Sequence, residues 1–336
     1  MKKTGIIYAT NKEYLTITLA SMLSLLECNK DKKLRIYFMT ENLTSDDYQL
    51  IEKISKNYPL VNLSIHPIEC YHIDQYKIPG WQNTQAANAR LFFERILDNK
   101  LDEVEEVLYL DSDTIIVDDL SELSQYSGSI YAALDNVDHG YIEQLGVTRY
   151  FNSGVLKINI DWWKKGNVEN RIIRFVRDNP LKRLSYPDQD VLNCVLENDI
   201  CELPMNYNLP PSINIINNLV LSIHCKKTDK DIENIKKAKQ NPKILHSYGL
   251  LGIKPWTHNA INPYNEIFRK YIYEVNPEFE LQELSGMKQF LSDNPSLFNY
   301  LFLLKSYTPD YFQRLAKNSM TLCKKNKTSK NNKYHD

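Results

Sequence analysis

The sequence predicts an α/β fold whose mostly parallel central sheet carries helices on both faces, followed by a short helical C-terminal extension. Its length of 336 residues and its composition, 43% hydrophobic and 25% charged, are those of a folded globular chain. Short apolar runs alternate with segments of helical periodicity over most of the chain. Such alternation, at spacings that suit right-handed crossovers, is typical of a parallel sheet covered on both sides.

Apolar runs predict the first four strands: "GIIYAT", "KLRIYFMT", "VNLSIHPIE" and "EEVLYLDSD". Between them we predict the helices "EYLTITLASMLSLLE", "SDDYQLIEKISKNY", with Ser45 as its N-cap, and "TQAANARLFFERILD". Later strands are expected in "SIYAALD", "YFNSGVLKINI" and "CELPMNYNL", and helices in "VENRIIRFVRDN" and "DQDVLNCVLEN". From about residue 262 the alternation stops. We therefore predict a sheet domain over residues 1–261 and a helical extension over residues 262–336.

Charge and cysteine usage exclude several classes of protein. A net charge of −1 gives no general attraction to nucleic acid. The six cysteines show no CxxC pair and no regular spacing, which argues against a disulfide framework or a structural zinc site and for a reducing compartment. The N-terminal apolar stretch is too short for a secretory signal, and no window approaches the ~18 uninterrupted apolar residues of a membrane span. We therefore expect a cytoplasmic protein.

The segment "VLYLDSDTIIVDDL" brings two carboxylates, Asp111 and Asp113, to the carboxyl end of the fourth strand. Ligands of open α/β sheets bind beyond that edge, and burying an ionised carboxylate is costly unless a cation compensates it. One interpretation is a divalent cation that bridges the phosphates of a nucleotide. A second is a haloacid-dehalogenase-type phosphatase, because "DSDTI" resembles the motif in which the first Asp of those enzymes is a nucleophile. A solvated turn is the third interpretation.

Other segments, taken in order, favour the nucleotide interpretation. "YFNSGVLKINI", "YPDQDVLN" and "HSYGLLGIKPW", together with "ANARL" and "AALD", resemble motifs of the retaining glycosyltransferases of family 8, which includes glycogenin and bacterial lipopolysaccharide galactosyl- and glucosyltransferases. The resemblance spans about residues 5–256. It implies a GT-A type, Rossmann-like fold and transfer of glucose or galactose from a UDP-hexose to a glycan, glycolipid or glycoprotein. A phosphatase and a non-catalytic nucleotide-sugar-binding module remain the alternatives.

The resemblance also implies roles for individual residues. Asp111, Asp113 and His246 would hold Mn²⁺, or Mg²⁺, against the diphosphate of the UDP-sugar. Lys254 would add a positive charge there, and either Gly249 or Gly252 would offer backbone N–H groups. The remaining donor contacts that it implies are Ala9, Thr10, Asn11, Tyr14, Arg90, Ser112, Asp135, Asn152 and Ser153. Asn11 stands where relatives usually have Asp, and Glu13 where they usually have Asn, so base selectivity and any role for Glu13 stay open.

The D-Q-D segment carries the predicted catalytic residues, Asp188, Gln189 and Asp190. By the resemblance, Gln189 occupies the position on the β face of the sugar, and an amide is a poor nucleophile. We therefore favour a front-face route, in which the leaving diphosphate helps to deprotonate the acceptor and Gln189 stabilises an oxocarbenium-like state. Asp190 is the carboxylate that would serve a two-step mechanism, or else it caps the following helix.

The C-terminal tail is basic and aromatic. After Asp310 it carries seven Lys or Arg residues and no acid before Asp336, with aromatic and aliphatic residues among them. Such a composition is typical either of a disordered, solvated end or of a segment that binds the surface of an anionic membrane. The sequence leaves both interpretations open.

Overall fold

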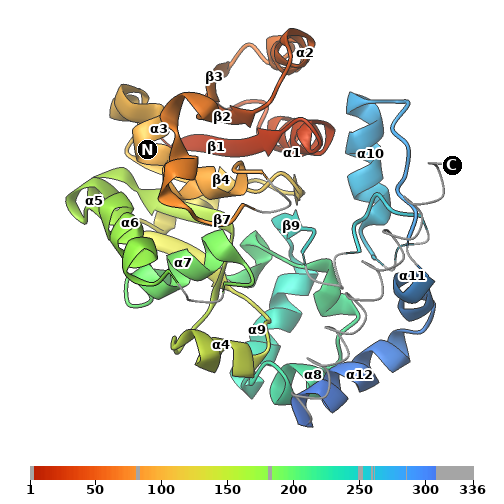
Figure 1. The fold of residues 1–336 in the computed structure, drawn as a ribbon. Coiled ribbons are helices and arrows are strands. Elements are labelled where there is room, and N and C mark those ends of the chain that lie inside the picture. Colours follow the sequence, from red (N-terminus) through yellow and green to blue (C-terminus); the bar gives the residue numbers. More distant parts are fainter. Residues whose placement is uncertain are drawn as a thin grey trace, which may run out of the picture.

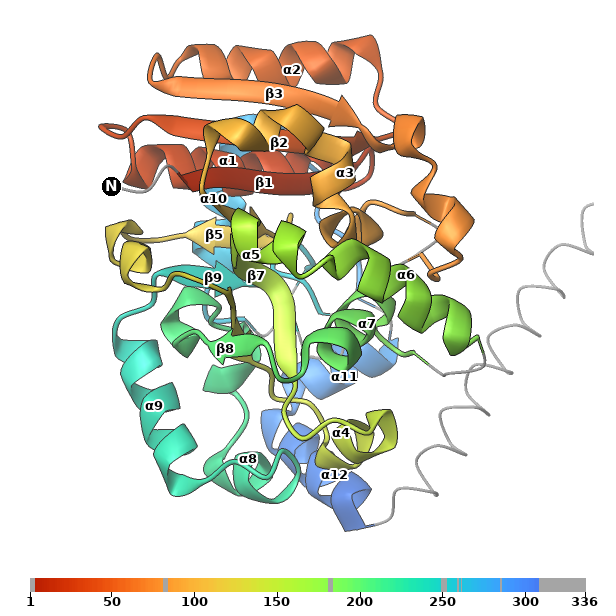
Figure 2. The same cartoon turned by 90° about the vertical axis from the view of Figure 1, so that its left-hand side faces the viewer.

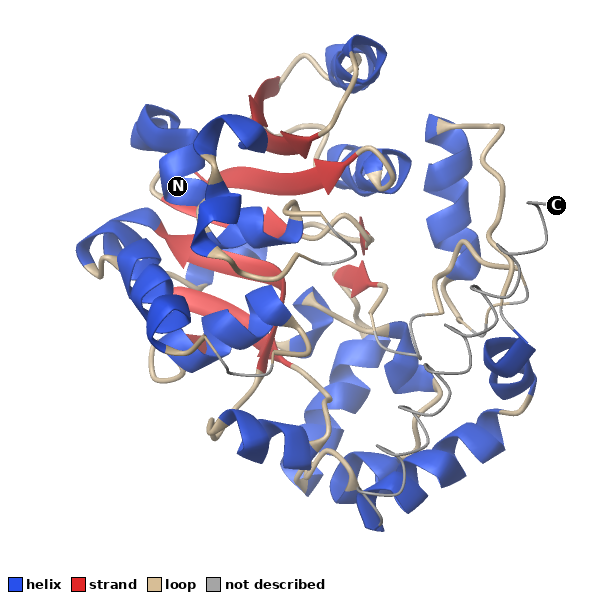
Figure 3. Cartoon of the chain, viewed as in Figure 1, coloured by secondary structure: helices blue, strands red, loops and turns tan. Residues whose placement is uncertain are grey.

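A computed structural model of the chain describes residues 4–80, 84–180, 184–248, 253–258, 260, 262–284 and 286–307. Its centre is a seven-stranded sheet in the order β3-β2-β1-β4-β7-β6-β8 (Figure 1, Figure 3). Neighbouring strands are parallel, except that β7 runs antiparallel to both β4 and β6. A second sheet pairs β5 with β9. The strands are β1 Thr4–Asn11, β2 Leu34–Glu41, β3 Val61–Pro67, β4 Glu106–Leu110, β5 Thr114–Ile116, β6 Ile130–Leu134, β7 Phe151–Asn159, β8 Ile200–Glu202 and β9 Ile244–His246.

Helices cover both faces of the sheet, as predicted. The α-helices are α1 Leu15–Cys28, α2 Ser45–Lys56, α3 Phe93–Leu97, α4 His139–Leu145, α5 Ile160–Lys165, α6 Val168–Asp178, α7 Pro187–Leu196, α8 Asn218–Ile223, α9 Asp229–Gln240, α10 Asn265–Val275, α11 Gly286–Asp293 and α12 Pro295–Tyr307. Figure 2 shows α5, α6 and α7 in front of the sheet and α1 behind it.

Alternation along the strands produces these two faces. Ile7 of β1 and Val107 of β4 point into the core that includes α3, α6 and α7. Their neighbours Ile6 and Leu108 point the other way, into the core that includes α1 and α2. Successive side chains of a strand alternate between faces, so a strand buried on both faces must be apolar at nearly every position. The continuous apolar runs that predicted the first strands have this origin.

The N-terminus of helix α2 differs from the prediction by one residue. Thr44, and not Ser45, has the extended backbone of an N-cap, with φ −91° and ψ 168°. The Asp47 carboxylate accepts a hydrogen bond from the Thr44 backbone N–H at 2.9 Å. This is one half of a capping box, which satisfies a donor that the helix itself leaves free.

The predicted helix "TQAANARLFFERILD" is broken. It forms a 3₁₀ turn at Ala87–Leu91 and then the short helix α3. The Glu41 carboxylate accepts the backbone N–H groups of Gln85 and Ala86, and residues 88–93 are buried without a solvent-facing stripe. An amphipathic helix needs such a stripe, so the apolar content of this segment does not extend one regular helix.

Beyond residue 262 the described chain is helical as predicted, as far as Tyr307. Phe268 and Ile272 of α10 share a core with Ile17 and Ala20 of α1, so this helix lies directly against the sheet domain (Figure 1). Helix α12 lies beside α8 (Figure 2). None of the helices in the described ranges is both long and apolar enough to cross a membrane. The basic tail, residues 308–336, lies outside the described residues.

Candidate active site

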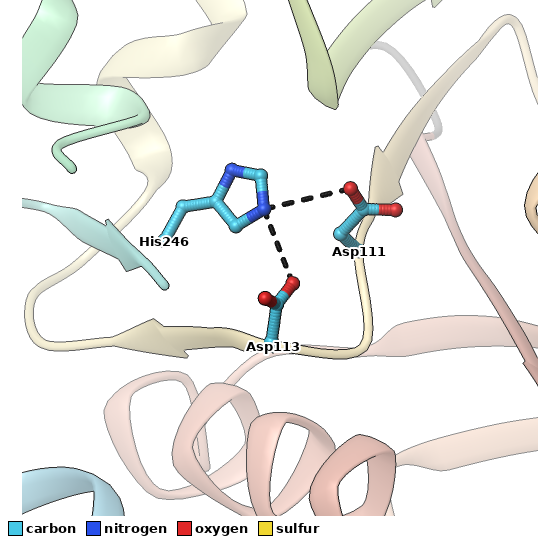
Figure 4. A group of neighbouring side chains, drawn as sticks. All are labelled: Asp111, Asp113 and His246. Atoms are coloured by element: carbon cyan, nitrogen blue, oxygen red, sulfur yellow. Dashed lines mark hydrogen bonds and ion pairs between the residues drawn. The ribbon is translucent and has the colours of Figure 1, made fainter. Parts of the chain in front are cut away.

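The two aspartates of the D-x-D segment and His246 meet at the carboxyl end of β4. Asp111 follows β4 directly, Asp113 precedes β5, and His246 ends β9. Thr114 of β5 is the register partner of His246, so Asp113 and His246, which are 133 positions apart, become neighbours. His246 Nε2 lies 3.1 Å from Asp113 Oδ1 and 3.5 Å from Asp111 Oδ2 (Figure 4). One ligand atom from each residue lies within 4.8 Å of the others, which is the convergence that a divalent cation requires.

Gly154 of β7 leaves the space in which these residues converge. A Cβ atom on residue 154 would lie 2.0 Å from His246 Cε1 and 2.7 Å from Asp111 Oδ2, closer than real Cβ contacts come. The backbone at this position also holds the site, because Asp111 N–H donates to Gly154 O at 2.8 Å. Two carboxylates and one imidazole are a donor set that suits Mn²⁺ or Mg²⁺. The residues present therefore fit a divalent cation.

Arg90 joins the metal group to the start of helix α7. Its Nη2 lies 2.6 Å from Asp111 Oδ1, and its Nε lies 3.0 Å from Asp188 Oδ2. Nη1 donates to the backbone oxygen of Ser153 at 2.8 Å and to its hydroxyl at 2.9 Å. The guanidinium lies over the ring of Tyr109, 4.7 Å from its centroid. Arg90 was predicted to touch the donor, and in this structure it pairs with the carboxylates of Asp111 and Asp188.

Burial and charge act against each other at these groups. Burial alone would raise the pKa of Asp113, but the charges of Lys254 and His246 outweigh it and lower that pKa below its ordinary value. Burial raises the pKa of Asp188, and Arg90 counteracts the increase only in part. Burial alone would lower the pKa of Arg90, but Asp111 and Asp188 reverse this and raise it. Asp113 is therefore an ionised carboxylate at neutral pH, and it can bind a cation.

A group of buried amides lies next to the metal group. Gln189 Oε1 accepts from the backbone N–H of Ser153 at 2.9 Å, and its Nε2 donates to Asp135 Oδ2 at 3.0 Å. The same Asp135 oxygen accepts from Asn152 Nδ2 at 3.1 Å. Asp135 therefore fixes which way two amide side chains point. Polar side chains that are buried and fully oriented in this way are typical of a site that recognises a polar ligand.

The family comparison agrees with this geometry. The family model described as Glycosyl transferase family 8 matches residues 5–260, which include every residue of the metal and amide groups. The chain belongs to glycosyl transferase family 8. It is therefore a glycosyltransferase that uses a nucleotide-sugar donor. The family assignment favours this activity over the phosphatase interpretation of "DSDTI".

Two curated relatives of this family 8 chain cover most of its length. General stress protein A of Bacillus subtilis is 24% identical over 255 residues, which are 73% of this chain and 84% of that protein. A lipopolysaccharide 1,2-glucosyltransferase of Escherichia coli is 22% identical over 329 residues, which are 94% of this chain and 91% of that protein. Among solved structures, galactosyltransferase LgtC in complex with donor and acceptor sugar analogues has a TM-score of 0.66 at 19% identity, covering 81% of this chain and 96% of that chain. That likeness confirms the GT-A type fold.

Asp190 of the family 8 chain is held by three tyrosines. Its carboxylate accepts hydrogen bonds from the hydroxyls of Tyr141 and Tyr150 and from the backbone N–H of Tyr186. The residue is fully buried. A carboxylate with this many donors is stabilised in place, and it anchors the first turn of α7, which carries Asp188 and Gln189.

The end of β1 and the turn that follows it were predicted to bind the base of the donor. Ser112 donates to the backbone oxygen of Ala9 at 3.0 Å, and the Thr10 hydroxyl accepts from Thr18 at 2.8 Å. Asn11 Oδ1 accepts a hydrogen bond from the Tyr14 backbone N–H at 3.0 Å. The Nδ2 group of Asn11 takes no part in this hydrogen bond. The Tyr14 ring packs edge-on against Trp256, with 6.2 Å between the ring centroids.

Lys254 also lies at the site. Its Nζ donates to Asp113 Oδ2 and, at 2.6 Å, to the backbone oxygen of Ser247. Gly249 and Gly252, the other predicted contacts of the diphosphate, lie outside the described residues.

Sequence reasoning missed Gly154, Tyr109 and Asn208. Gly154 is part of the quoted "FNSG" segment, but its role depends on where His246 lies. Tyr109 donates to Asp111 Oδ1 at 3.1 Å and supports Arg90. Asn208 contacts His246 Nδ1 at 2.8 Å. Asn208 lies within the predicted strand "CELPMNYNL", and its spacing gave no signal of a site.

Proposed function

We propose that this glycosyltransferase transfers glucose or galactose, with retention, from a UDP-hexose to a hydroxyl of a glycan, glycolipid or glycoprotein in a Mn²⁺-dependent reaction. The observation that carries the proposal is the convergence of Asp111, Asp113 and His246 on the space that Gly154 leaves open. The names of relatives support the substrate class, since one is a lipopolysaccharide glucosyltransferase of Escherichia coli and another a lipopolysaccharide galactosyltransferase of Salmonella typhimurium. Glucose and galactose differ at one hydroxyl, so both stay in the proposal.

The proposed chemistry divides between the leaving group and the sugar. Bound at Asp111, Asp113 and His246, Mn²⁺ would supply Lewis-acid neutralisation of the departing diphosphate. Lys254, whose Nζ already lies at Asp113, would add a positive charge to the same diphosphate.

On the sugar side, Asn152 and Asp188 would bind the ring hydroxyls. Gln189 Oε1 would stabilise the positive charge that develops at the anomeric carbon. Because Asp190 is held by tyrosine hydroxyls, we assign it a positioning role and favour the front-face route over a two-step mechanism.

The nucleotide would lie on the end of β1 and the turn that follows it. We propose that Ala9, Thr10 and Ser112 border the uridine and that the ring of Tyr14 packs against the base. Asn11 would donate from Nδ2, because its oxygen accepts the Tyr14 N–H. Gly249 or Gly252 would contribute backbone N–H groups to the diphosphate.

The test is a panel of UDP-sugars, assayed for hydrolysis with Mn²⁺ and with EDTA, followed by the preferred donor against a panel of glycan acceptors. We expect Mn²⁺-dependent cleavage of UDP-glucose or UDP-galactose. Release of phosphate from p-nitrophenyl phosphate without cleavage of any UDP-sugar would instead support the phosphatase alternative. Binding of a UDP-sugar without turnover against any acceptor or water would support the non-catalytic module.

We also propose that the protein acts in the cytoplasm and that its basic tail attaches it reversibly to an anionic membrane. Each basic residue near such a surface contributes ~1 kcal/mol, so the seven Lys or Arg after Asp310 suffice with modest apolar burial. Full-length protein should co-sediment with anionic vesicles at low salt but not at high salt. Truncation after about residue 306 should abolish sedimentation and largely retain hydrolysis of the UDP-sugar. Equal pelleting of both proteins would remove the tail from this account.

A further inference from the structure

Asn208 is a buried side chain beside the metal group that the proposed reaction does not use. It has no exposed surface, and its Oδ1 lies 2.8 Å from His246 Nδ1. Its Nδ2 donates to Asn152 Oδ1 at 2.8 Å. The backbone fixes it there, because Leu209 N–H donates to Ile244 O at 2.9 Å and His246 N–H donates to Leu209 O at 3.0 Å. Asn208 is therefore held next to His246 by the backbone hydrogen bonds of Leu209 as well as by its own side chain.

The backbone N–H of Gly154 fixes the direction of these hydrogen bonds, because it can only donate. The backbone N–H of Gly154 lies 2.9 Å from Asn152 Oδ1, so the oxygen of that amide must face it. Asn208 must then turn its NH₂ group toward the same oxygen and its own Oδ1 toward His246. Consequently His246 Nδ1 carries a ring proton, and Nε2 is the ring nitrogen that faces Asp111 and Asp113.

The other end of this series of hydrogen bonds lies at Asp135 and Gln189, on the proposed sugar side of the site. Asn152 Nδ2 and Gln189 Nε2 both donate to Asp135 Oδ2. A continuous, buried path of hydrogen bonds thus runs from His246 through Asn208, Asn152 and Asp135 to Gln189. Networks of this kind orient every member when each donor and acceptor is satisfied.

We infer that Asn208 is a positioning residue that fixes His246 in the tautomer that binds the metal and ties the metal group to Gln189. The inference rests on the proposed function, since it assumes a cation at Asp111, Asp113 and His246. Metal-binding histidines generally donate their second ring N–H to an outer partner, and loss of that partner typically costs about 10- to 100-fold in metal affinity.

The experiment measures Mn²⁺ binding to the full-length protein directly, by the electron paramagnetic resonance signal of free Mn²⁺, with and without UDP. Asn208→Leu removes both hydrogen bonds at similar volume, and it should weaken Mn²⁺ binding about 10- to 100-fold. Asn208→Asp can still accept from His246 Nδ1, so its Mn²⁺ affinity should stay close to that of the wild type. Its carboxylate would face Asn152 Oδ1, acceptor to acceptor, so its kcat should fall. The control is Asn29→Leu. Asn29 is another buried asparagine, at the C-terminal end of α1, and its replacement should change stability without changing Mn²⁺ affinity.

Two outcomes would overturn the inference. One is a folded Asn208→Leu protein that binds Mn²⁺ as tightly as the wild type. The other is an Asn208→Asp protein that loses as much Mn²⁺ affinity as Asn208→Leu, and this variant decides the question if Asn208→Leu does not fold. If the wild type itself binds no Mn²⁺ with or without UDP, the metal assignment in the proposed function has failed, and this inference fails with it.

Discussion

The strands β4 and β7 carry buried charge at both ends, and the two ends differ in how that charge is compensated. At one end Lys157 of β7 lies 2.6 Å from Glu106 of β4, with side chains only 2% and 1% exposed. At the other end the four carboxylates of Asp111, Asp113, Asp135 and Asp188 lie near three basic side chains. Arg90 and Lys254 pair with three of these carboxylates, and Lys227 donates to the backbone oxygen of Asp135 at 2.8 Å. At the first end one carboxylate is matched by one cation, whereas the second end has more carboxylates than basic side chains.

This difference distinguishes a structural cluster from a functional one on the same pair of strands. Removing one partner from a buried pair leaves an uncompensated charge, so we expect the loss of Lys157 to lower stability and to leave the metal group unchanged. Burying more carboxylates than cations costs free energy until a further cation binds. This excess of carboxylates lies at the carboxyl end of β4, where α/β sheets bind their ligands.

Asp113→Asn should abolish turnover and severely weaken Mn²⁺-dependent UDP binding while the protein stays folded. The amide cannot supply the ionised oxygen that Lys254 and His246 now stabilise. Turnover and UDP binding across a Mn²⁺ titration check this, with Asp119→Asn as a control on a carboxylate that is 46% exposed. Retained activity of a folded Asp113→Asn protein at saturating Mn²⁺ would falsify the metal assignment.

Gln189→Ala should lower kcat by about 10²- to 10³-fold, the usual effect of removing one polar group that stabilises a transition state. UDP affinity should change much less, because Gln189 is proposed to act on the sugar during transfer. Steady-state kinetics beside UDP titrations separate the two effects. If UDP affinity collapsed and kcat with bound donor held steady, Gln189 would belong to the nucleotide pocket instead.

Gly154→Ala should reduce turnover by about 100-fold, because a methyl group 2.0 Å from His246 Cε1 must displace that ring. Mn²⁺ affinity should fall with it. Gly140→Ala is a matched control: its Cβ would meet only an Asp138 oxygen at 3.5 Å, an ordinary contact. The steric account fails if the two alanine variants bind Mn²⁺ equally well.

Lys157→Met should leave kcat of the folded protein unchanged while lowering its stability by about 3–5 kcal/mol, because Glu106 then loses its buried partner. Chemical denaturation measures the loss. The double variant Lys157→Met, Glu106→Gln should recover part of it, since no unpaired charge remains. A change in Mn²⁺ affinity of folded Lys157→Met would mean that the two ends of β4 and β7 are not independent.

The sequence predicted the layered α/β fold and brought Asp111, Asp113 and His246 to one site, because strand ends and family motifs are local signals. It did not predict what depends on three-dimensional neighbours. The role of Gly154 is set by the ring of His246, and that of Asn208 by the backbone pairing of Leu209 with β9. The segment before β4 reads as one helix, yet residues 88–93 are buried on every side and the segment divides into a 3₁₀ turn and the short helix α3. These contacts join residues far apart in sequence, where periodicity and propensity carry no information.

Thermal unfolding in the presence of Mn²⁺ and UDP tests most directly whether the carboxylate surplus is a cation site. A ligand that binds only the folded state raises Tm with its concentration. We predict that Mn²⁺ with UDP raises Tm of the wild type and of Lys157→Met, that EDTA removes the increase, and that Asp113→Asn shows none. An equal increase for Asp113→Asn, or no increase for the wild type, would contradict the account.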